Sequence, residues 1–447
     1  MRGSVFEHRE TRPDRVEPVQ VLALGEGYAT TKVNTTLFRH HGLVTQGDWQ
    51  FGAFYVSSEE ITIVRRDLRD DTISRGTIIG SFKPADMHNC ISLGLDANGY
   101  VHIAYDHHGN PLNYRRSLHP FDVTAWTDPL AMTGKLEDRV TYPQFLMCPG
   151  NRRDEGLSGR LLFLYRHLGS SNGDICLKEY DPESQTWSDT SERFVKGMDQ
   201  QPWTSNAYWD HPSFDSRGNL MLSWVWRVVQ NASAKGDFIF NHNHGFARSP
   251  DGRRWFTSHG VELSLPMTQV NSEIVWPTTP GATIGNMCSS AVDSQDRPHI
   301  VGYGADSPDG VPQYRHIWFD GSGWQCQTLS ERTEPFGLLV WNVPMSRPEI
   351  LIDRDDSVYV IYRCDITEHR LVAQRLEPPN YEPPGTILKL WPEDLGRSEP
   401  IVDRVRWARD GVLSMLVQRA AQPDQRAKQD LPPEQVSIVD WRLSGCM

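Results

Sequence analysis

Residues 96–105 read DANGYVHIAY, and this stretch decides the fold class. A turn of Asp, Asn and Gly residues leads into an alternating apolar strand that ends in an aromatic residue. The same device returns at 215–224 (DSRGNLMLSW), 293–301 (DSQDRPHIV), 353–362 (DRDDSVYVIY) and 410–416 (DGVLSML), and in a looser form at 156–165 (GLSGRLLFLY). The starts at 96, 156, 215, 293, 353 and 410 lie 60, 59, 78, 60 and 57 residues apart. A repeat of nearly constant length therefore runs through the chain.

Each repeat has the length of one propeller blade. Four short strands with their turns occupy about 40 to 60 residues, and a blade buries both faces of its sheet only by stacking against its neighbours. The six repeats, with a seventh upstream at 47–55 (GDWQFGAFY), predict an all-β, seven-bladed β-propeller. A pair of β-sandwiches or a parallel β-helix is the alternative. No linker divides the chain, so we expect a single domain over 1–447, with an N-terminal segment at 1–30 and a closing segment at 418–447.

Composition and charge narrow the classes of partner. The chain has 45 Lys and Arg against 57 Asp and Glu, a formal net charge of −12, which argues against a dedicated nucleic-acid binder. No apolar run is long enough to cross a membrane, and residues 1–19 lack the apolar core of a signal peptide. We therefore expect a monomer without nucleic-acid or membrane partners. It would be secreted or periplasmic if a leader has been removed, and cytoplasmic otherwise.

The densest polar run flanks one predicted strand pair. Residues 86–90 (DMHNC) precede the pair, and residues 106–116 (DHHGNPLNYRR) follow its return strand. His88 and His108 are 108 − 88 = 20 residues apart, a gap that two strands of five or six residues and a turn would fill. A hairpin of this kind brings its two open ends together. We therefore expect both histidines to face one pocket at a mouth of the propeller.

The following blades add phenols and a guanidinium at comparable strand ends. Tyr142 lies in 141–145 (TYPQF), Arg166 ends the strand after it, and Tyr208 repeats the place of Tyr142 one blade later. Small polar turns put His244 and Asn286 on later blades. The candidate substrate-binding residues are Asn89, Asn110, Tyr208, His244 and Asn286.

Two His, two Tyr and one Arg without an evident carboxylate pair favour proton abstraction beside a carboxylate. Glycosidases normally use two carboxyl groups at a defined separation, whereas the Asp residues here lie largely in turns. Removing the C5 proton of a uronic acid develops enolate charge on its carboxylate, which Arg and His can neutralise. His or Tyr can take the proton, and its partner can protonate the leaving glycosidic oxygen. Tyr serves as the base only where neighbouring cations lower its pKa.

Four segments resemble the BNR-repeat family of propeller enzymes, which includes ulvan lyases and rhamnosyl-glucuronate lyases acting on gum arabic side chains. They are 88–89 (HN), 105–116 (YDHHGNPLNYRR), 141–145 (TYPQF) and 165–166 (YR), and the resemblance extends from about residue 32 to residue 363. It implies a seven-bladed propeller with the site in a cleft at one mouth. It also implies a metal-independent β-elimination that yields an unsaturated uronate.

The resemblance further implies a role for each candidate. His88 is similar to the histidine on the carboxylate side, and His108 to the histidine of the acid/base pair. Tyr142 matches the catalytic tyrosine, Arg166 the carboxylate-neutralising arginine and Tyr208 a tyrosine at the edge of the site. No cofactor is implied for catalysis. Family members often carry a structural calcium or zinc, whose ligands do not map onto this sequence.

We therefore expect a polysaccharide lyase that acts on a uronic-acid-containing polysaccharide or oligosaccharide. The specific expectation is an L-rhamnose-α-1,4-D-glucuronate lyase. Two alternatives stay open. One is an α-L-rhamnosidase-type hydrolase with the same pocket, because some relatives are assigned that activity. The other is a non-catalytic carbohydrate-binding propeller whose aromatic side chains stack on sugars.

Overall fold

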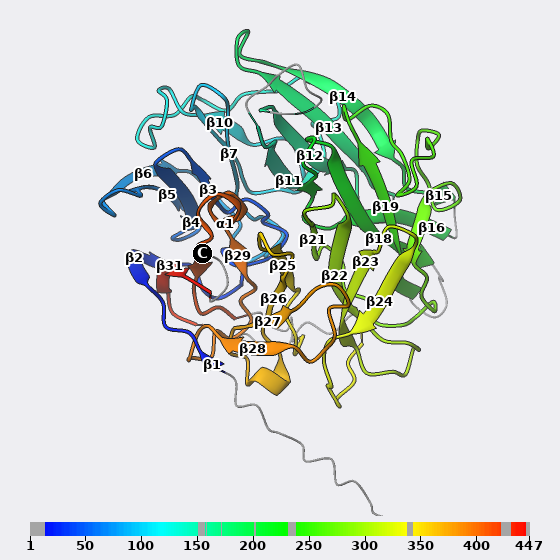
Figure 1. Ribbon diagram of the computed structural model, residues 1–447. Helices are drawn as coiled ribbons and strands as arrows, with labels where there is room; N and C mark the ends of the chain where they lie inside the picture. Colours follow the sequence, from blue (N-terminus) through cyan, green and yellow to red (C-terminus); the bar gives the residue numbers. More distant parts are fainter. Residues whose placement is uncertain are drawn as a thin grey trace, which may run out of the picture.

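The computed structural model describes residues 14–150, 157, 159–170, 172–200, 203–230, 238–337, 343–421 and 431–443. The strands form seven sheets arranged in a ring (Figure 1). This arrangement confirms the predicted all-β, seven-bladed propeller. Within the described residues the helices are α1 (Arg404–Asp410) and the short 3₁₀ turn η1 (Asp365–Thr367).

The first three blades lie in sequence order around the ring. The first blade contains β3 (Leu43–Gln46), β4 (Trp49–Tyr55), β5 (Glu60–Asp67) and β6 (Ile73–Ile79). The second contains β7 (Ser92–Leu95), β8 (Val101–Ala104) and β10 (Tyr114–Arg116). The third contains β9 (His108–Asn110), β11 (Val140–Met147), β12 (Leu161–His167), β13 (Asp174–Asp181) and β14 (Thr186–Val195). The strand β9 thus leaves its sequence neighbours and joins the third blade.

Four further blades complete the ring. The fourth contains β15 (Asp199–Gln200), β16 (Trp203–Trp209), β17 (Ser213–Phe214), β18 (Leu220–Gln230), β19 (Phe238–Ser249) and β20 (Glu273–Trp276). The fifth contains β21 (Ser289–Val292), β22 (Pro298–Gly304), β23 (Gln313–Phe319) and β24 (Trp324–Thr328). The sixth contains β25 (Glu349–Ile352), β26 (Val358–Tyr362), β27 (Val372–Leu376), β28 (Thr386–Lys389) and β1 (Asp14–Arg15). The seventh contains β29 (Ile401–Val402), β30 (Leu413–Val417), β31 (Glu434–Trp441) and β2 (Gln20–Gly27).

Four of the predicted turns share one geometry, and each joins two antiparallel strands of one blade: β7 to β8, β17 to β18, β21 to β22 and β25 to β26. Their leading residues are Asp96, Asp215, Asp293 and Asp353. In each turn the Asp Oδ1 accepts the backbone N–H groups two and four positions later, at 2.8–3.0 Å. The residue three positions later is Gly or Asp, with φ between 61° and 84°. Gly and Asp tolerate this left-handed backbone better than most residues. The local turn chemistry thus explains why the sequence repeats as it does.

The ring closes with strands from the start of the chain. β2 pairs antiparallel with β31 and forms the edge strand of the seventh blade. β1 pairs in parallel with β28 on the sixth blade. Of the predicted N-terminal segment, residues 1–13 lie outside the described residues, as do residues 422–430 and 444–447 of the predicted closing segment.

The seventh blade contains a helix where the sequence pattern indicated only a turn. The Asp403 side chain caps α1 by accepting the Arg406 N–H at 3.0 Å, and Gly411 ends the helix with φ 62°. Asp410 is therefore the last helical residue and not the head of an Asp turn. The strand that follows, β30, lies where the repeat predicts it. In the described part of the chain, no helix combines the length and apolar character needed to cross a membrane.

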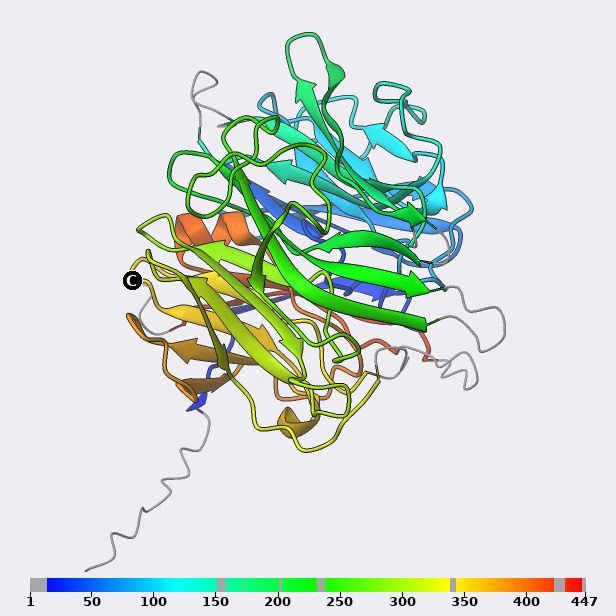
Figure 2. The ribbon, with the colours of Figure 1, turned by 90° about the vertical axis from the view of Figure 1, so that its right-hand side faces the viewer.

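The fourth blade explains the one long interval in the repeat. Its strands β18 and β19 are 11 and 12 residues long, and the chain runs through residues 250–272 before it returns as β20. Figure 2 shows the long green strands of this blade crossing the side that faces the viewer. The extra length lies within one blade, so the count of seven is unchanged.

The core lies between the blades. The described side chains form seven buried hydrophobic clusters, and each cluster spans two neighbouring blades. One joins Phe51 of the first blade to Leu93 of the second. Another joins Ile438 of the seventh blade to Phe54 of the first and so closes the ring. Because each cluster draws on two blades, stability depends on the complete ring.

Gly76 in β6 marks a close approach between blades. A Cβ at this position would lie 1.6 Å from the carbonyl oxygen of Val123, in the segment after β10. Gly76→Ala should therefore lower the free energy of unfolding by about 2 kcal/mol or more, measured from urea unfolding curves. Gly323→Ala is the matched control, because a Cβ there would meet nothing within 4 Å. Equal unfolding midpoints for the two variants would contradict this packing.

Candidate active site

One row of strand pairing brings three predicted residues to the same place. Thr141 of β11 pairs with His108 of β9 on one side and with Arg166 of β12 on the other. Paired residues of this kind have Cα atoms about 4.5–5.5 Å apart. His108 and Arg166 therefore flank the residue that directly precedes Tyr142. The exchange of β9 into the third blade is what places His108 in this row.

Tyr142 has an unusual backbone conformation. Its φ is 53°, and the register between β11 and β12 shifts between Thr141 and Gln144. Pro143 has no N–H to give to a neighbouring strand, and Pro in a sheet is typical of such irregularities. A non-glycine residue at positive φ costs on the order of 1–3 kcal/mol, and such residues concentrate at functional sites. The strained backbone therefore supports Tyr142 as a candidate site residue.

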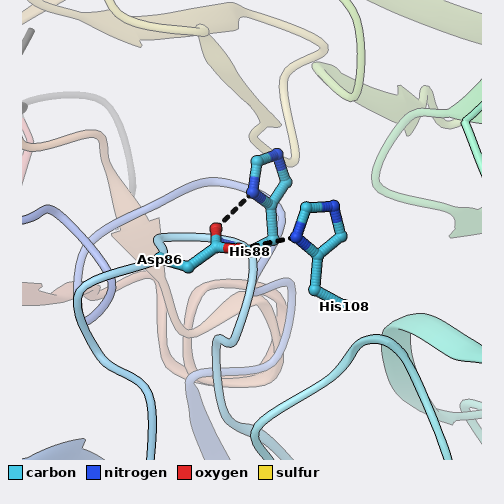
Figure 3. Close-up of side chains that lie close together, drawn as sticks. All are labelled: Asp86, His88 and His108. Atoms are coloured by element: carbon cyan, nitrogen blue, oxygen red, sulfur yellow. Dashed lines mark hydrogen bonds and ion pairs between the residues drawn. The ribbon is translucent and has the colours of Figure 1, made fainter. Parts of the chain in front are cut away.

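His88 and His108 share one carboxylate. Asp86 Oδ1 lies 2.5 Å from His88 Nδ1, and Asp86 Oδ2 lies 2.6 Å from His108 Nδ1 (Figure 3). The two imidazole rings stack with centroids 4.1 Å apart and an interplanar angle of 20°. The His88 side chain is 21% exposed and the His108 side chain 40%. The pair therefore presents an accessible edge to solvent.

Buried aromatic rings support the histidine pair. The Phe38 ring stacks on His88 at 5.4 Å, and the Tyr142 ring lies 5.0 Å from Phe38 and 6.0 Å from His88. Tyr208 of the fourth blade adds a second phenol, 5.9 Å from Tyr142 between ring centroids. Both tyrosines are buried. The site thus combines partly exposed imidazoles with two phenols from neighbouring blades.

Arg166 lies over both phenols. Its Cζ is 4.9 Å from the ring centroid of Tyr142 and 5.5 Å from that of Tyr208. The side chain is buried, and its Nε and Nη1 have no hydrogen-bond partner among the described residues. A second guanidinium, Arg227, donates to the Tyr208 hydroxyl at 3.1 Å. Buried unpaired donors are costly, and an anionic ligand would supply the acceptors that Arg166 lacks.

The surroundings shift the pKa values of these groups in different directions. Burial raises the pKa of Tyr142, and the nearby Tyr208 adds to the rise, so the Tyr142 phenol is protonated at neutral pH. Burial also acts on Tyr208, but Arg227 and Arg166 outweigh it and lower the pKa of that phenol. Burial lowers the pKa of His88 to about 4, although its hydrogen bond to Asp86 opposes this. Tyr142 is therefore a proton donor and His88 is neutral in the ligand-free protein at neutral pH.

Asp86, His88 and His108 also have the side-chain types of a metal site. Their ligand atoms lie within 4.8 Å of one another. Two ligand atoms of a tetrahedral zinc, each about 2.0–2.1 Å from the ion, are about 3.4 Å apart. The distances of 2.5 and 2.6 Å between carboxylate oxygen and imidazole nitrogen are much shorter and fit hydrogen bonds. This trio does not fit a metal ion, and the expected structural calcium or zinc stays a prediction.

The other predicted substrate-binding residues have different surroundings. Asn89 donates to the Lys83 carbonyl, and Asn110 binds the backbone of its own turn, accepting from the His108 N–H at 2.7 Å. His244 is fully buried, stacks on Trp276 at 5.6 Å and has its Nε2 3.5 Å from Asp210 Oδ2. The carbonyl of Asn286 accepts from Arg347 Nε at 2.7 Å. Their binding roles stay predictions, and of the five predicted substrate-binding residues only Tyr208 makes a ring or cation contact with the Tyr142–Arg166 pair among the described residues.

Three residues near the histidine pair, the two tyrosines and Phe38 were not among the predicted site residues. Asp86 belongs to the polar run at 86–90. It was not predicted as a site residue because most Asp residues of this sequence lie in turns. Arg227 and Arg347 carry no local signal, because they reach the site from other blades. The Arg347 Cζ lies 4.2 Å from the centroid of Phe38. Only the folded ring reveals that three arginines surround the two tyrosines and Phe38.

Comparisons with known proteins agree with this architecture. Residues 49–332 match the model of a family described as "BNR repeat-containing family member". An ulvan lyase of Alteromonas sp. (strain LOR) is 25% identical over 268 residues, which cover 54% of this chain and 52% of the relative. An ulvan lyase of family PL25 from Pseudoalteromonas sp. (strain PLSV) is 23% identical over 271 residues, with the same coverage. The chain matches about half the length of these curated relatives.

Solved structures share the fold over nearly the whole chain. A PL25 ulvan lyase bound to -[GlcA(1-4)Rha3S]- superposes with a TM-score of 0.68 and 16% identity, covering 93% of this chain and 95% of the other. The polysaccharide lyase Uly1 gives a TM-score of 0.69 and 14% identity, covering 96% and 99%. At these identities the similarity shows the seven-bladed fold alone.

Proposed function

The chain belongs to the BNR repeat-containing family, and from this premise we propose that it is a polysaccharide lyase that cleaves beside a glucuronic acid residue by β-elimination. One observation carries the proposal. His108, Tyr142 and Arg166 converge, so that a proton acceptor, a proton donor and a cation with two unpaired donors lie together. The similarity to ulvan lyases supports the same reaction class.

Arg166 would bind the uronate carboxylate. Its Nε and Nη1 have no partner among the described residues, and each can donate an N–H group to an anionic acceptor. Neutralising this group stabilises the enolate charge that develops when C5 loses its proton. His88, expected on the carboxylate side, lies next to His108 with ring centroids 4.1 Å apart.

His108 and Tyr142 would move the protons. Asp86 accepts from His108 Nδ1, so the Nε2 lone pair of the neutral ring is free to take the C5 proton. The protonated Tyr142 phenol would give its proton to the leaving glycosidic oxygen. The C5–H and C4–O bonds break, and a C4–C5 double bond forms. Return of the proton from His108 to the Tyr142 oxygen, directly or through water, restores the site.

We assign the substrate as an L-rhamnose-α-1,4-D-glucuronate linkage in a uronic-acid-containing chain. The ligand -[GlcA(1-4)Rha3S]- of the similar PL25 structure contains glucuronate and sulfated rhamnose, which supports this pair of sugars, while the linkage printed for it runs from glucuronate to rhamnose. The alternative, a rhamnosidase that hydrolyses the glycosidic bond with two carboxyl groups, has less support. Among the described residues Asp86 is the carboxylate in contact with the histidines, and both its oxygens are engaged by them.

A spectroscopic assay tests the proposed function. The protein is mixed with ulvan, with gum arabic and with ulvan whose carboxyl groups have been reduced to alcohols. A lyase produces the ultraviolet absorbance of the unsaturated uronate with one or both native polymers and none with the reduced polymer. New reducing ends without this absorbance would identify a hydrolase. Binding without new ends would identify a carbohydrate-binding propeller.

Arg166→Ala should reduce kcat/KM on the uronate substrate by about 10- to 100-fold, the range expected for a lost charge-assisted hydrogen bond. Initial rates across a substrate series would measure it. The thermal midpoint of the same sample separates lost recognition from lost packing, because the buried guanidinium lies over the Tyr142 and Tyr208 rings. An unchanged kcat/KM would show that Arg166 does not recognise the carboxylate.

A further inference from the structure

We propose that Asp86 is a positioning residue that holds both histidines in one tautomer, so that two unprotonated Nε2 atoms face the substrate side by side. The part of this proposal that concerns turnover rests on the proposed lyase function. The part that concerns the imidazole rings depends only on the geometry of Asp86, His88 and His108 (Figure 3).

The hydrogen-bond geometry determines where the ring protons lie. An ionised carboxylate can only accept hydrogen bonds. Since Asp86 Oδ1 contacts His88 Nδ1 and Oδ2 contacts His108 Nδ1, each Nδ1 must carry a proton. A neutral ring protonated at Nδ1 has its lone pair on Nε2. Figure 3 shows the second nitrogen of each ring on the side away from Asp86.

Asp86 is itself fixed and ionised. The backbone N–H of His88 donates to Oδ1 at 3.0 Å, which orients the carboxylate. Burial alone would raise the pKa of Asp86, but the hydrogen bonds from His108 and His88 outweigh it and hold this pKa far below its usual value. The carboxylate therefore remains an acceptor across the whole working range of pH, and the tautomers stay locked.

The stacked rings can accommodate one added proton but not two. Two imidazolium rings with centroids 4.1 Å apart would repel each other, and one carboxylate balances one positive charge. His88 is the more buried ring and feels the positive charge of Arg166. His108 is more exposed. The proton taken from the substrate therefore resides on His108, while Asp86 stabilises the resulting imidazolium.

Asp86→Asn tests this role without changing the size of the side chain. An amide offers one oxygen and one NH₂ group in place of two oxygens. One histidine can keep its Nδ1–H, whereas the other must accept at Nδ1 and carry its proton on Nε2. We expect kcat to fall by about 100-fold or more, as for a misoriented general base, while KM changes little. Asp128→Asn, at an exposed carboxylate, is the matched control.

NMR of histidine nitrogens reads the tautomers in the substrate-free protein. His88→Gln and His108→Gln identify the two sets of signals. The parent protein should show a protonated Nδ1 and an unprotonated Nε2 on both rings, and Asp86→Asn should reverse one of them. Unchanged tautomers or parental kcat in Asp86→Asn would overturn the proposal. Loss of these signals or of activity on chelation would overturn it too, because the trio would then hold a metal. Locked tautomers in a protein without lyase activity would refute the proposed function alone.

Discussion

Replacing Tyr142 with phenylalanine should lower kcat on a rhamnose–glucuronate substrate by about 100- to 10,000-fold, the range for loss of a positioned proton donor. The burial that keeps this phenol protonated suits it to donate to the leaving oxygen. The fold should persist, because the hydroxyl makes no hydrogen bond within the described residues and the ring is retained. Initial rates of ultraviolet absorbance, with thermal unfolding of the same sample, measure both effects.

Tyr165→Phe is the matched control for Tyr142→Phe. Tyr165 is also buried in the third blade, where its ring packs against Phe163 with centroids 5.4 Å apart. It should keep parental turnover, because it makes no ring contact with the histidine pair. Parental kcat in Tyr142→Phe would remove Tyr142 from the proton transfer. An equal loss in both variants would show that any buried phenol of this blade affects turnover through stability.

Replacing Glu399 with alanine should lower the free energy of unfolding by about 3 to 5 kcal/mol, as expected when a buried charge cluster loses one partner. Glu399 is buried and accepts hydrogen bonds from Lys32 Nζ at 2.8 Å and from Arg347 Nη1 at 2.9 and 3.1 Å. It also accepts the Leu37 N–H at 2.7 Å. Removing this carboxylate leaves two buried cations facing each other without their anion.

Urea unfolding curves of Glu399→Ala would measure this loss. Glu17→Ala is the control, because Glu17 pairs with Arg15 at the surface, where both side chains are more than half exposed. A surface pair of this kind contributes about 0 to 1 kcal/mol. Equal unfolding midpoints for the two variants would show that the buried cluster does not stabilise the ring.

The fold was predictable because its signal is local. The turns headed by Asp96, Asp215, Asp293 and Asp353 each satisfy their own backbone within five residues, so the sequence repeats wherever the geometry does. The strands that close the ring were harder to place. β1 and β2 pair with strands several hundred residues away, and no local sequence pattern predicts which strands these are. The helix α1 is too short for hydrophobic periodicity to reveal it.

The site was predictable where its residues lie on one hairpin or in one pairing row. His88 and His108 flank the pair formed by β7 and β8, and His108 and Arg166 share a row with Thr141. The sequence did not reveal two kinds of site residue. Some contact the site from another blade, and Asp86 has a residue type that is common in turns. Arg227 reaches Tyr208 only after the fourth blade has folded. Asp86 has the same residue type as the turn residues, and only its distances to two imidazoles reveal its role.

Cleavage of a rhamnose–glucuronate oligosaccharide in water enriched in heavy oxygen tests the reaction most directly. Elimination breaks the C4–O bond without adding water, whereas hydrolysis places a water oxygen at the new reducing end. Mass spectrometry of samples quenched before the anomeric hydroxyl exchanges should show an unsaturated uronate, lighter than the hydrolytic product by one water, and no heavy oxygen at the new ends. Saturated products that carry heavy oxygen at the reducing end would contradict β-elimination at this site.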